Sequence, residues 1–263
     1  MLEFQNVTKV FNPGTVNEKV AVNNLSLKME DGDFVTVIGS NGAGKSTMLN
    51  LVAGLWKPDS GKILIDDIDV TKMPEHKRAK YIGRVFQDPH DGTASDMNIE
   101  ENLAIAARRG KKHTLKWGIS KTEREAYREL LAGLGLGLED RMTSKVGLLS
   151  GGQRQAITLL MASLESPKIL LLDEHTAALD PKTAKVVLEL TDKIVSQNHL
   201  TTMMVTHNMK DAIAHGNRLI MMNNGSVLLD IKGEEKKNLT IEDLLEKFNQ
   251  TSGQVFASDK ALL

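Results

Sequence analysis

The first residues that could do chemistry form a glycine-rich loop ending in a lysine and two hydroxyl side chains. The loop has the spacing G-x-x-x-x-G-K-[ST] and lies between an apolar run and a helical pattern. Glycines leave backbone N–H groups free to surround phosphate oxygens, Lys45 reaches the outer phosphates, and the Ser46 hydroxyl can ligate Mg²⁺. An incidental turn is the alternative, but a chance match is on the order of one per cent. The nine residues predicted to bind phosphate are Gly39, Ser40, Asn41, Gly42, Ala43, Gly44, Lys45, Ser46 and Thr47.

Two adjacent carboxylates follow an apolar run at Ile169–Leu172. In such an arrangement Asp173 can hold Mg²⁺ and Glu174 can orient a water for attack. A strand that ends in Asp-Glu is, taken alone, more often a turn than a site. The pair therefore needs support from the rest of the chain.

That support comes from the pentapeptide Leu149-Ser150-Gly151-Gly152-Gln153, which resembles the signature of ABC transporter nucleotide-binding subunits. Other motifs of that family follow in its order along nearly the whole chain. Phe11 resembles the aromatic that stacks on adenine, Gln87 the glutamine loop, Ala178-Leu179-Asp180 the D-loop, and His207 the switch histidine. The resemblance implies an ATPase that works with Mg²⁺.

Roles for individual residues follow from this resemblance. It implies that Lys45, Gln87, Glu174 and His207 serve catalysis, with Glu174 as general base and His207 contacting the γ-phosphate. It implies that Ser46, Gln87 and Asp173 hold Mg²⁺. Besides the glycine-rich loop, the residues expected to contact ATP are Phe11, Ser150, Gly151, Gly152, Gln153 and Asp180.

The signature residues are expected to open a helix, where a hydroxyl and free N–H groups face outward to meet a phosphate. The glycine-rich loop of the same chain is already filled by its own ATP. The family's solution is a head-to-tail pair in which each signature caps the ATP of the other copy. We therefore expect a homodimer around two Mg-ATP.

Further partners follow from the family. The resemblance implies a separate membrane permease that the Gln87 loop contacts, and a cytoplasmic ATPase held on the inner face of the membrane by that permease. The loop that follows Gln87, together with the variant signature helix, resembles a branch of bacterial importers paired with a lipoprotein substrate receptor. An extracytoplasmic substrate-binding protein and a small solute such as an amino acid are the expected counterparts. The basic segment Arg108–His113, with Lys116 and Trp117, could contact permease or lipid, or simply be solvated.

Three residues depart from the family pattern. Ala178 replaces the serine common at the start of the D-loop, which removes a hydroxyl but leaves Asp180. Ala156 and Met161 stand where many members carry arginine. None of these changes removes a group with an expected catalytic role.

Composition limits the other classes of function. The 263 residues have a formal net charge of -1, which provides no basic field for nucleic acid. There is no cysteine, so disulfides and thiolate metal sites are excluded. The apolar runs are far shorter than the roughly 18–20 residues that span a bilayer, and the N-terminus lacks the pattern of an export signal.

The elements that must place these residues follow an α/β pattern. Strands are predicted at Val20–Met29, Phe34–Ile38, Ile169–Leu172 and Thr202–Val205, with a hairpin of Arg218–Met222 and Ser226–Ile231. Helices are predicted at Ser46–Leu55, after Gly151, at Lys182–Val195 and at Ile241–Phe248. We expect a P-loop NTPase (RecA-like) core with an N-terminal antiparallel β subdomain and an inserted helical subdomain. The ATPase domain should span 1–232, with β core at 1–87 and 165–232, helical insert at 88–164, and a C-terminal helix and tail at 233–263.

Two other functions remain open from the residues. One is a soluble ABC-type ATPase of translation or DNA repair, although those usually have fused cassettes, a coiled-coil insert or a basic arm. The other is a scaffold that binds ATP without hydrolysing it. The presence of Lys45, Asp173, Glu174 and His207 argues against that scaffold.

Overall fold

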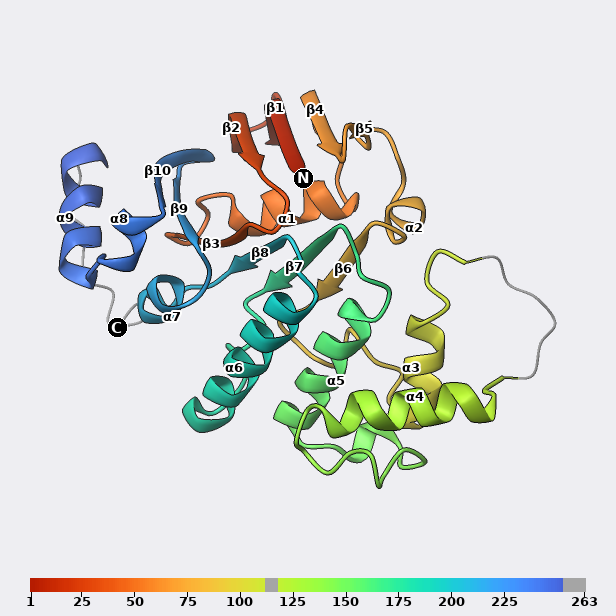
Figure 1. The fold of residues 1–263 in the computed structure, drawn as a ribbon. Coiled ribbons are helices and arrows are strands. Elements are labelled where there is room, and N and C mark those ends of the chain that lie inside the picture. The colour runs from red at the N-terminus through yellow and green to blue at the C-terminus, as the bar shows by residue number, and fades with distance from the viewer. Residues whose placement is uncertain (112–117, 253–263) are drawn as a thin grey trace.

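The computed structural model describes residues 1–111 and 118–252, which fold into two sheets with helices between and beside them (Figure 1). Lys112, His113, Lys116 and Trp117 of the predicted basic contact segment lie outside the described residues, as does the tail at 253–263. None of the helices in the described ranges combines the length and apolar character that crossing a bilayer requires.

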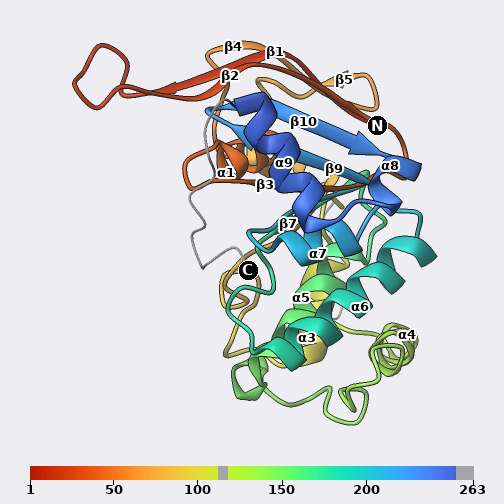
Figure 2. The same ribbon diagram turned by 90° about the vertical axis from the view of Figure 1, so that its left-hand side faces the viewer.

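The first sheet is antiparallel, with strand order β2-β1-β4-β5. Along β2, buried Leu25, Leu27 and Met29 alternate with exposed residues, so one face of the sheet packs inward and the other meets solvent. Figure 2 shows the connection between β1 and β2 reaching beyond the other strands. The strands are β1 (Leu2–Phe11), β2 (Lys19–Met29), β4 (Ser60–Ile65) and β5 (Ile68–Asp69).

The second sheet has the order β10-β9-β3-β8-β7-β6 and is parallel except for its edge strand β10. Its central strands are continuous apolar runs because both of their faces are buried. The strands are β3 (Phe34–Gly39), β6 (Ile82–Val85), β7 (Ile169–Asp173), β8 (Thr202–Val205), β9 (Arg218–Asn223) and β10 (Ser226–Lys232). The carboxyl ends of β3, β6, β7 and β8 therefore meet at one edge, where parallel α/β sheets bind ligands.

Apolar side chains divide between the two faces of this second sheet. Ile169 and Leu171 point toward a core shared with α1 and the antiparallel sheet, whereas Leu170 and Leu172 point toward the helices on the opposite face. Figure 1 shows the same layering, with α1 between the two sheets and α3, α4, α5 and α6 beyond the second. The predicted α/β P-loop fold class is confirmed.

The helices begin where the sequence supplies caps. Asn98, Ser120 and Ser150 each form a capping box at the start of α3, α4 and α5, and Asp180 followed by Pro181 opens α6. The helices are α1 (Lys45–Ala53), α2 (Glu75–Arg78), α3 (Ile99–Ala106), α4 (Lys121–Ala132), α5 (Gly151–Ser163), α6 (Pro181–Gln197), α7 (Met209–Ala214), α8 (Glu234–Lys237) and α9 (Ile241–Ser252), with a 3₁₀ turn at Val146–Leu148.

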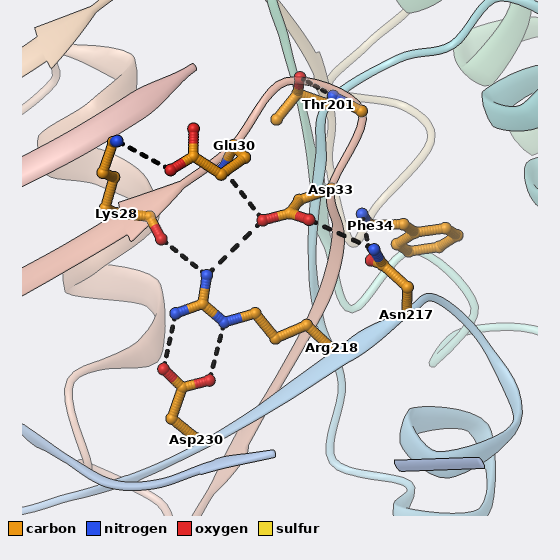
Figure 3. A network of polar contacts seen from close by, with 9 residues as sticks. Lys28, Glu30, Asp33, Phe34, Thr201, Asn217, Arg218 and Asp230 are labelled. Carbon is orange, nitrogen blue, oxygen red and sulfur yellow. Dashed lines mark hydrogen bonds and ion pairs between the residues drawn. The ribbon is translucent and has the colours of Figure 1, made fainter. Parts of the chain in front are cut away.

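A network of polar contacts fastens the two sheets together (Figure 3). The Arg218 guanidinium on β9 donates two hydrogen bonds to Asp230 on β10, at 2.7 and 2.6 Å. It also donates to the Lys28 carbonyl on β2 at 2.6 Å and lies 3.6 Å from the Asp33 carboxylate. Asp33 accepts in turn from the Asn217 amide. One side chain thus connects the antiparallel sheet to the edge of the parallel one.

Candidate functional site

The glycine-rich loop connects β3 to α1 and fits a space that only glycine can occupy at key points. Gly44 caps α1 with φ 103°, and a Cβ there would lie 2.4 Å from the Ala21 carbonyl oxygen. A Cβ on Gly39 would lie 2.3 Å from the Met222 carbonyl oxygen. Residues with side chains would therefore push the loop out of place. The loop is held between the antiparallel sheet and the β9–β10 hairpin.

Lys45 is folded back onto this loop. Its Nζ donates to the carbonyl oxygens of Gly39 at 2.7 Å and Ser40 at 3.2 Å, and the residue is 6% exposed. Burial lowers the pKa of the Lys45 ammonium, while the nearby Glu174 and Asp173 carboxylates oppose that shift. The Lys45 ammonium is poorly solvated and lies against the loop, so it is positioned to bind an anion.

A cavity opens above the loop and reaches the end of β1. Phe11 lies at its rim, where its ring meets the Trp56 ring edge-to-face at 4.8 Å. Phe11 is partly buried and lines the cavity, and an aromatic ring in such a place can stack on a planar base. The lining residues are Phe11, Lys19, Ala21, Asn41, Gly42, Ala43, Gly44, Lys45, Ser46, Thr47 and Glu174. The structure therefore brings Phe11 and Glu174 into one cavity with the glycine-rich loop.

Asp173 ends β7 and is paired with Arg84 of β6. Arg84 Nη2 lies 3.3 Å from Asp173 Oδ2, and both side chains are largely buried, at 14% and 17% exposure. Burial raises the pKa of the Asp173 carboxyl, and the Arg84 cation partly opposes the rise. The Arg84 guanidinium also lies over the Phe86 ring, 4.7 Å from its centroid. Arg84 was not identified from the sequence, because its partner is 89 residues away.

Glu174 and His207 face each other across the ends of β7 and β8. Glu174 has φ 44°, a left-handed conformation that non-glycine residues seldom adopt, and its N–H donates to the Val205 carbonyl at 3.0 Å. His207 Nδ1 lies 3.5 Å from Glu174 Oε2. The carboxylate lines the loop cavity, so a base and a polar partner stand next to the proposed phosphate site.

Gln87 and one signature residue, Gly151, line a second cavity. Its lining includes Arg84, Gln87, Gly151, Asp173 and Leu179. Gln87 is exposed and shares this cavity with Asp173. The first cavity, above the glycine-rich loop, includes none of Ser150, Gly151, Gly152 or Gln153 in its lining. The structure thus groups Gln87 with Asp173 and leaves the signature outside the cavity of its own loop.

Ser150 and Asp180 both act as helix caps. Ser150 Oγ accepts from the Gln153 N–H at 3.3 Å, and Asp180 accepts from the Thr183 N–H at 3.1 Å. The hydrogen bonds from Thr183 lower the pKa of the exposed Asp180 carboxyl. Both side chains remain exposed at helix N-termini, where the partial positive charge favours an anion. A phosphate from outside could reach Ser150 without rearrangement of α5.

The side chains expected to bind metal supply the right kind of atoms for Mg²⁺. Ser46 offers a hydroxyl, Gln87 an amide oxygen and Asp173 a carboxylate, all hard oxygen ligands. Within residues 1–111 and 118–252, no cluster of three or more histidine, cysteine or acidic residues forms a separate metal site.

A second arginine contact also escaped the sequence prediction. Arg154, buried in the signature helix, lies within 2.6 Å of the His90 ring and donates to the Gly147 carbonyl at 3.0 Å. It therefore joins the loop after Gln87 to the signature helix. No local pattern signals such a contact, because it arises only when α5 packs beside β6.

Comparison with known proteins bears on this site. The family model described as ABC transporter matches residues 22–177. The chain is 50% identical over 253 residues to a tyrosine transport ATP-binding protein of Clostridioides difficile, covering 94% of this chain and 98% of that protein. It is 32% identical over 234 residues to an energy-coupling factor transporter ATP-binding protein of Clostridium perfringens, covering 88% and 79%.

Solved structures show the same fold. An ATP-binding cassette in a dimeric post-hydrolysis state, bound to ADP and Pi, is 30% identical with a TM-score of 0.75, covering 88% of this chain and 98% of that one. A cassette of an ABC transporter in its ADP conformation has a TM-score of 0.77 at 27% identity, covering 94% and 98%.

Proposed function

Because this chain belongs to the ABC transporter family and is an ATP-binding subunit that hydrolyses ATP to power transport, we propose that two copies of it close around two Mg-ATP to drive a small solute through a separate permease. The direction is import, and an amino acid such as tyrosine is the favoured substrate. The relative that is 50% identical over nearly its whole length, named for tyrosine transport, supports this substrate.

The observation that carries the hydrolytic proposal is the pairing of Glu174 with His207 at the rim of the loop cavity. Glu174 accepts a proton from water, whose oxygen attacks the γ-phosphorus while the bond to the ADP oxygen breaks. His207 holds the Glu174 carboxylate and contacts the γ-phosphate. Lys45 leaves its two loop carbonyls to neutralise the outer phosphates.

Mg²⁺ would be held by Ser46, Gln87 and Asp173 together with phosphate oxygens, and it would offset charge on the reacting phosphates. Gln87 stands at the mouth of a cavity that also contains Asp173. A side chain in that place can sense the occupancy of the metal site. We propose that Gln87 relays this state to the permease through its exposed loop.

The dimer proposal is supported by the place of the signature. Ser150, Gly151 and Gly152 open α5 outside the lining of their own loop cavity, with an exposed hydroxyl at a helix N-terminus. In the proposed pair, these groups and Gln153 contact the ATP of the other copy, and Asp180 lies at the interface. A structural neighbour that is dimeric with ADP and Pi adds support.

The remaining assignments follow from the same model. We propose an ATPase domain at 1–232, with β core at 1–87 and 165–232 and a helical insert at 88–164, followed by the C-terminal helix and tail. The permease holds the protein at the inner face of the membrane, and an extracytoplasmic substrate-binding protein delivers the solute. No nucleic acid partner is expected at a net charge of -1.

Substitution Glu174→Gln tests the hydrolytic part of the proposal. The variant should bind ATP with near-normal affinity, lose turnover at least a hundredfold, and accumulate as a stable dimer, because the amide cannot accept the proton. Calorimetry, phosphate release and light scattering measure the three effects. The matched control is Glu242→Gln on the exposed side of α9. A variant that hydrolyses normally, or stays monomeric with Mg-ATP, would contradict the model.

A further inference from the structure

Lys19 stands directly over the phosphate-binding loop although it belongs to no motif. It opens β2, and the register of the first sheet pairs it with Phe11 at the end of β1. The two residues therefore stand side by side at the rim of the loop cavity, and both line it. The strand pairing that supplies the aromatic wall also supplies a second cation.

The ammonium of Lys19 approaches the loop closely. A Cβ built on Gly42 would lie 2.9 Å from Lys19 Nζ, so the amino group rests against the centre of the loop. Gly42 is itself in the left-handed region, at φ 82°. Successive N–H groups of such a loop point at phosphate oxygens. Lys19 also lines the cavity in which those phosphates would lie.

In the part of the chain that the structure describes, the Lys19 ammonium forms no ion pair with an acidic side chain. Within residues 1–111 and 118–252, no hydrogen bond or ion pair joins Lys19 to another side chain. Glu18, the adjacent carboxylate, instead accepts a 2.6 Å hydrogen bond from the Gly14 N–H within the β1–β2 turn. The other nearby lysine, Lys9, is already paired with Asp59 at 3.0 Å. Lys19 is therefore available to a ligand.

Lys45 and Lys19 approach the loop differently. Lys45 is buried and bonded to the carbonyls at the start of the loop, whereas Lys19 is exposed and reaches the loop centre from above. In loops of this kind the backbone N–H groups hold the α- and β-phosphates, and the motif lysine extends toward the β and γ. A cation over Gly42 is thus closer to the phosphates that ADP retains.

We propose that Lys19 is a second phosphate-binding cation of the nucleotide site, contacting the α- and β-phosphates that ATP and ADP share. The inference rests on the proposed ATP function of the loop. The β1–β2 hairpin then supplies two groups to nucleotide binding, the aromatic ring of Phe11 and the positive charge of Lys19.

Substitution Lys19→Met in the full chain tests the proposal, with binding measured by calorimetry for ATP, ADP and inorganic pyrophosphate. We expect affinity for all three to fall about tenfold, the size typical of one lost charge-assisted hydrogen bond. Lys19→Arg should retain most of the affinity. The matched control is Lys28→Met, the same change on the same strand, where the side chain pairs with Glu30 at the other end of β2.

The possible outcomes distinguish a failure of the role of Lys19 from a failure of the proposed ATP binding. Unchanged affinity for ADP and pyrophosphate in Lys19→Met, or an equal loss in Lys28→Met, overturns the role of Lys19. A loss confined to ATP also overturns it, because it would place the contact on the γ-phosphate. If the unsubstituted protein binds neither ATP nor ADP, the proposed function itself fails.

Discussion

At the scale of single residues, the pairing with Arg84 favours the ionised form of Asp173, the proposed metal ligand, against the effect of burial. The carboxylate is largely buried, so without a cation its ionised form would be costly. Arg84 supplies that cation from the adjacent strand and is itself braced by the Phe86 ring. The ionised carboxylate is the form that binds Mg²⁺, so Arg84 favours the binding-competent form of Asp173.

Replacement of Arg84 with methionine should lower the free energy of unfolding by about 2 kcal/mol at neutral pH, because it leaves a partly buried carboxylate without its partner. The pKa of Asp173 is already raised by burial and should rise further. Protonation removes the unpaired charge, so the loss should shrink as pH falls through that pKa. Urea unfolding at several pH values measures this trend.

Arg84→Lys is the control for charge and Arg84→Met with Asp173→Asn is the control for the pair. The double variant should show little pH dependence beyond that of Asp173→Asn alone. A loss that is the same at acidic and neutral pH would mean that Arg84 acts only by packing.

The residues that the sequence could place are those whose geometry is local. The loop from Gly39 to Thr47, the acids after β7 and the cap at Ser150 depend on neighbours a few residues away, and spacing reveals them. Arg84 and Arg154 meet their partners only across strands or between helix and loop, and Lys19 approaches Gly42 only when the first sheet packs against the loop. No local sequence pattern specifies such contacts, so they could be identified only in the folded structure.

At the scale of elements, α5 and α6 pack so closely that the signature glycine is needed for space. A Cβ on Gly152 would lie 2.1 Å from Thr183 Cγ2 in the first turn of α6. The second glycine of the signature thus sets the distance between the two helix N-termini. Those two termini carry Ser150 and Asp180, both proposed to meet the nucleotide interface.

Substitution Gly152→Ala should destabilise the protein by about 1–3 kcal/mol through overpacking. Thr183→Ser in the same chain removes the colliding methyl, keeps the hydroxyl and should recover most of the loss. Urea unfolding of the two single variants and the double variant measures the coupling. Gly118→Ala is the control, since a Cβ there meets no atom of residues 1–111 and 118–252 within 4 Å. If the effects of the two substitutions on the free energy of unfolding are additive, the contact between residues 152 and 183 is not the source of the destabilisation.

The sequence predicted the central strands β3, β7 and β8 and the helices α1, α5, α6 and α9 to within a few residues. Thr202–Val205 matches β8 exactly in extent, and the helix predicted from Lys182 is α6, two residues longer at its C-terminal end. It missed β1, β4, β5 and β6. The polar residues of β1 and its register shifts between Phe4 and Val10 obscure the alternation that marks a strand.

At the scale of the whole molecule, Arg218 fastens the antiparallel sheet to the parallel one (Figure 3). Its hydrogen bonds to Asp230 and to the Lys28 carbonyl span three strands, and hydrogen bonding to Asp230 raises the pKa of the guanidinium. The same packing presses Ala21 and the β9–β10 turn against Gly44. Stable docking of the sheets is therefore a condition for the shape of the loop.

Substitution Arg218→Met should reduce stability by about 2–3 kcal/mol, because it removes the hydrogen bonds to the Asp230 carboxylate and the Lys28 carbonyl and the ion pair with Asp33. It should also weaken ATP binding, through the loop that the docking supports. Chemical unfolding and calorimetry measure the two effects. Arg128→Met on the exposed face of α4 is the control. If the Arg218→Met variant is destabilised but binds ATP normally, the shape of the loop does not depend on the docking of the sheets.

The walls of the nucleotide cavity come from different sheets. Phe11, Lys19 and Ala21 belong to the antiparallel sheet, whereas the glycine-rich loop and Glu174 belong to the parallel one. A nucleotide bound in this cavity therefore contacts both sheets and connects them reversibly. At a free concentration a hundredfold above its dissociation constant it adds about 2.7 kcal/mol to the folded state. Each cycle of hydrolysis and release then weakens the connection between the two sheets. Amide hydrogen exchange should therefore become faster in β1 and β2, which are remote from the scissile bond.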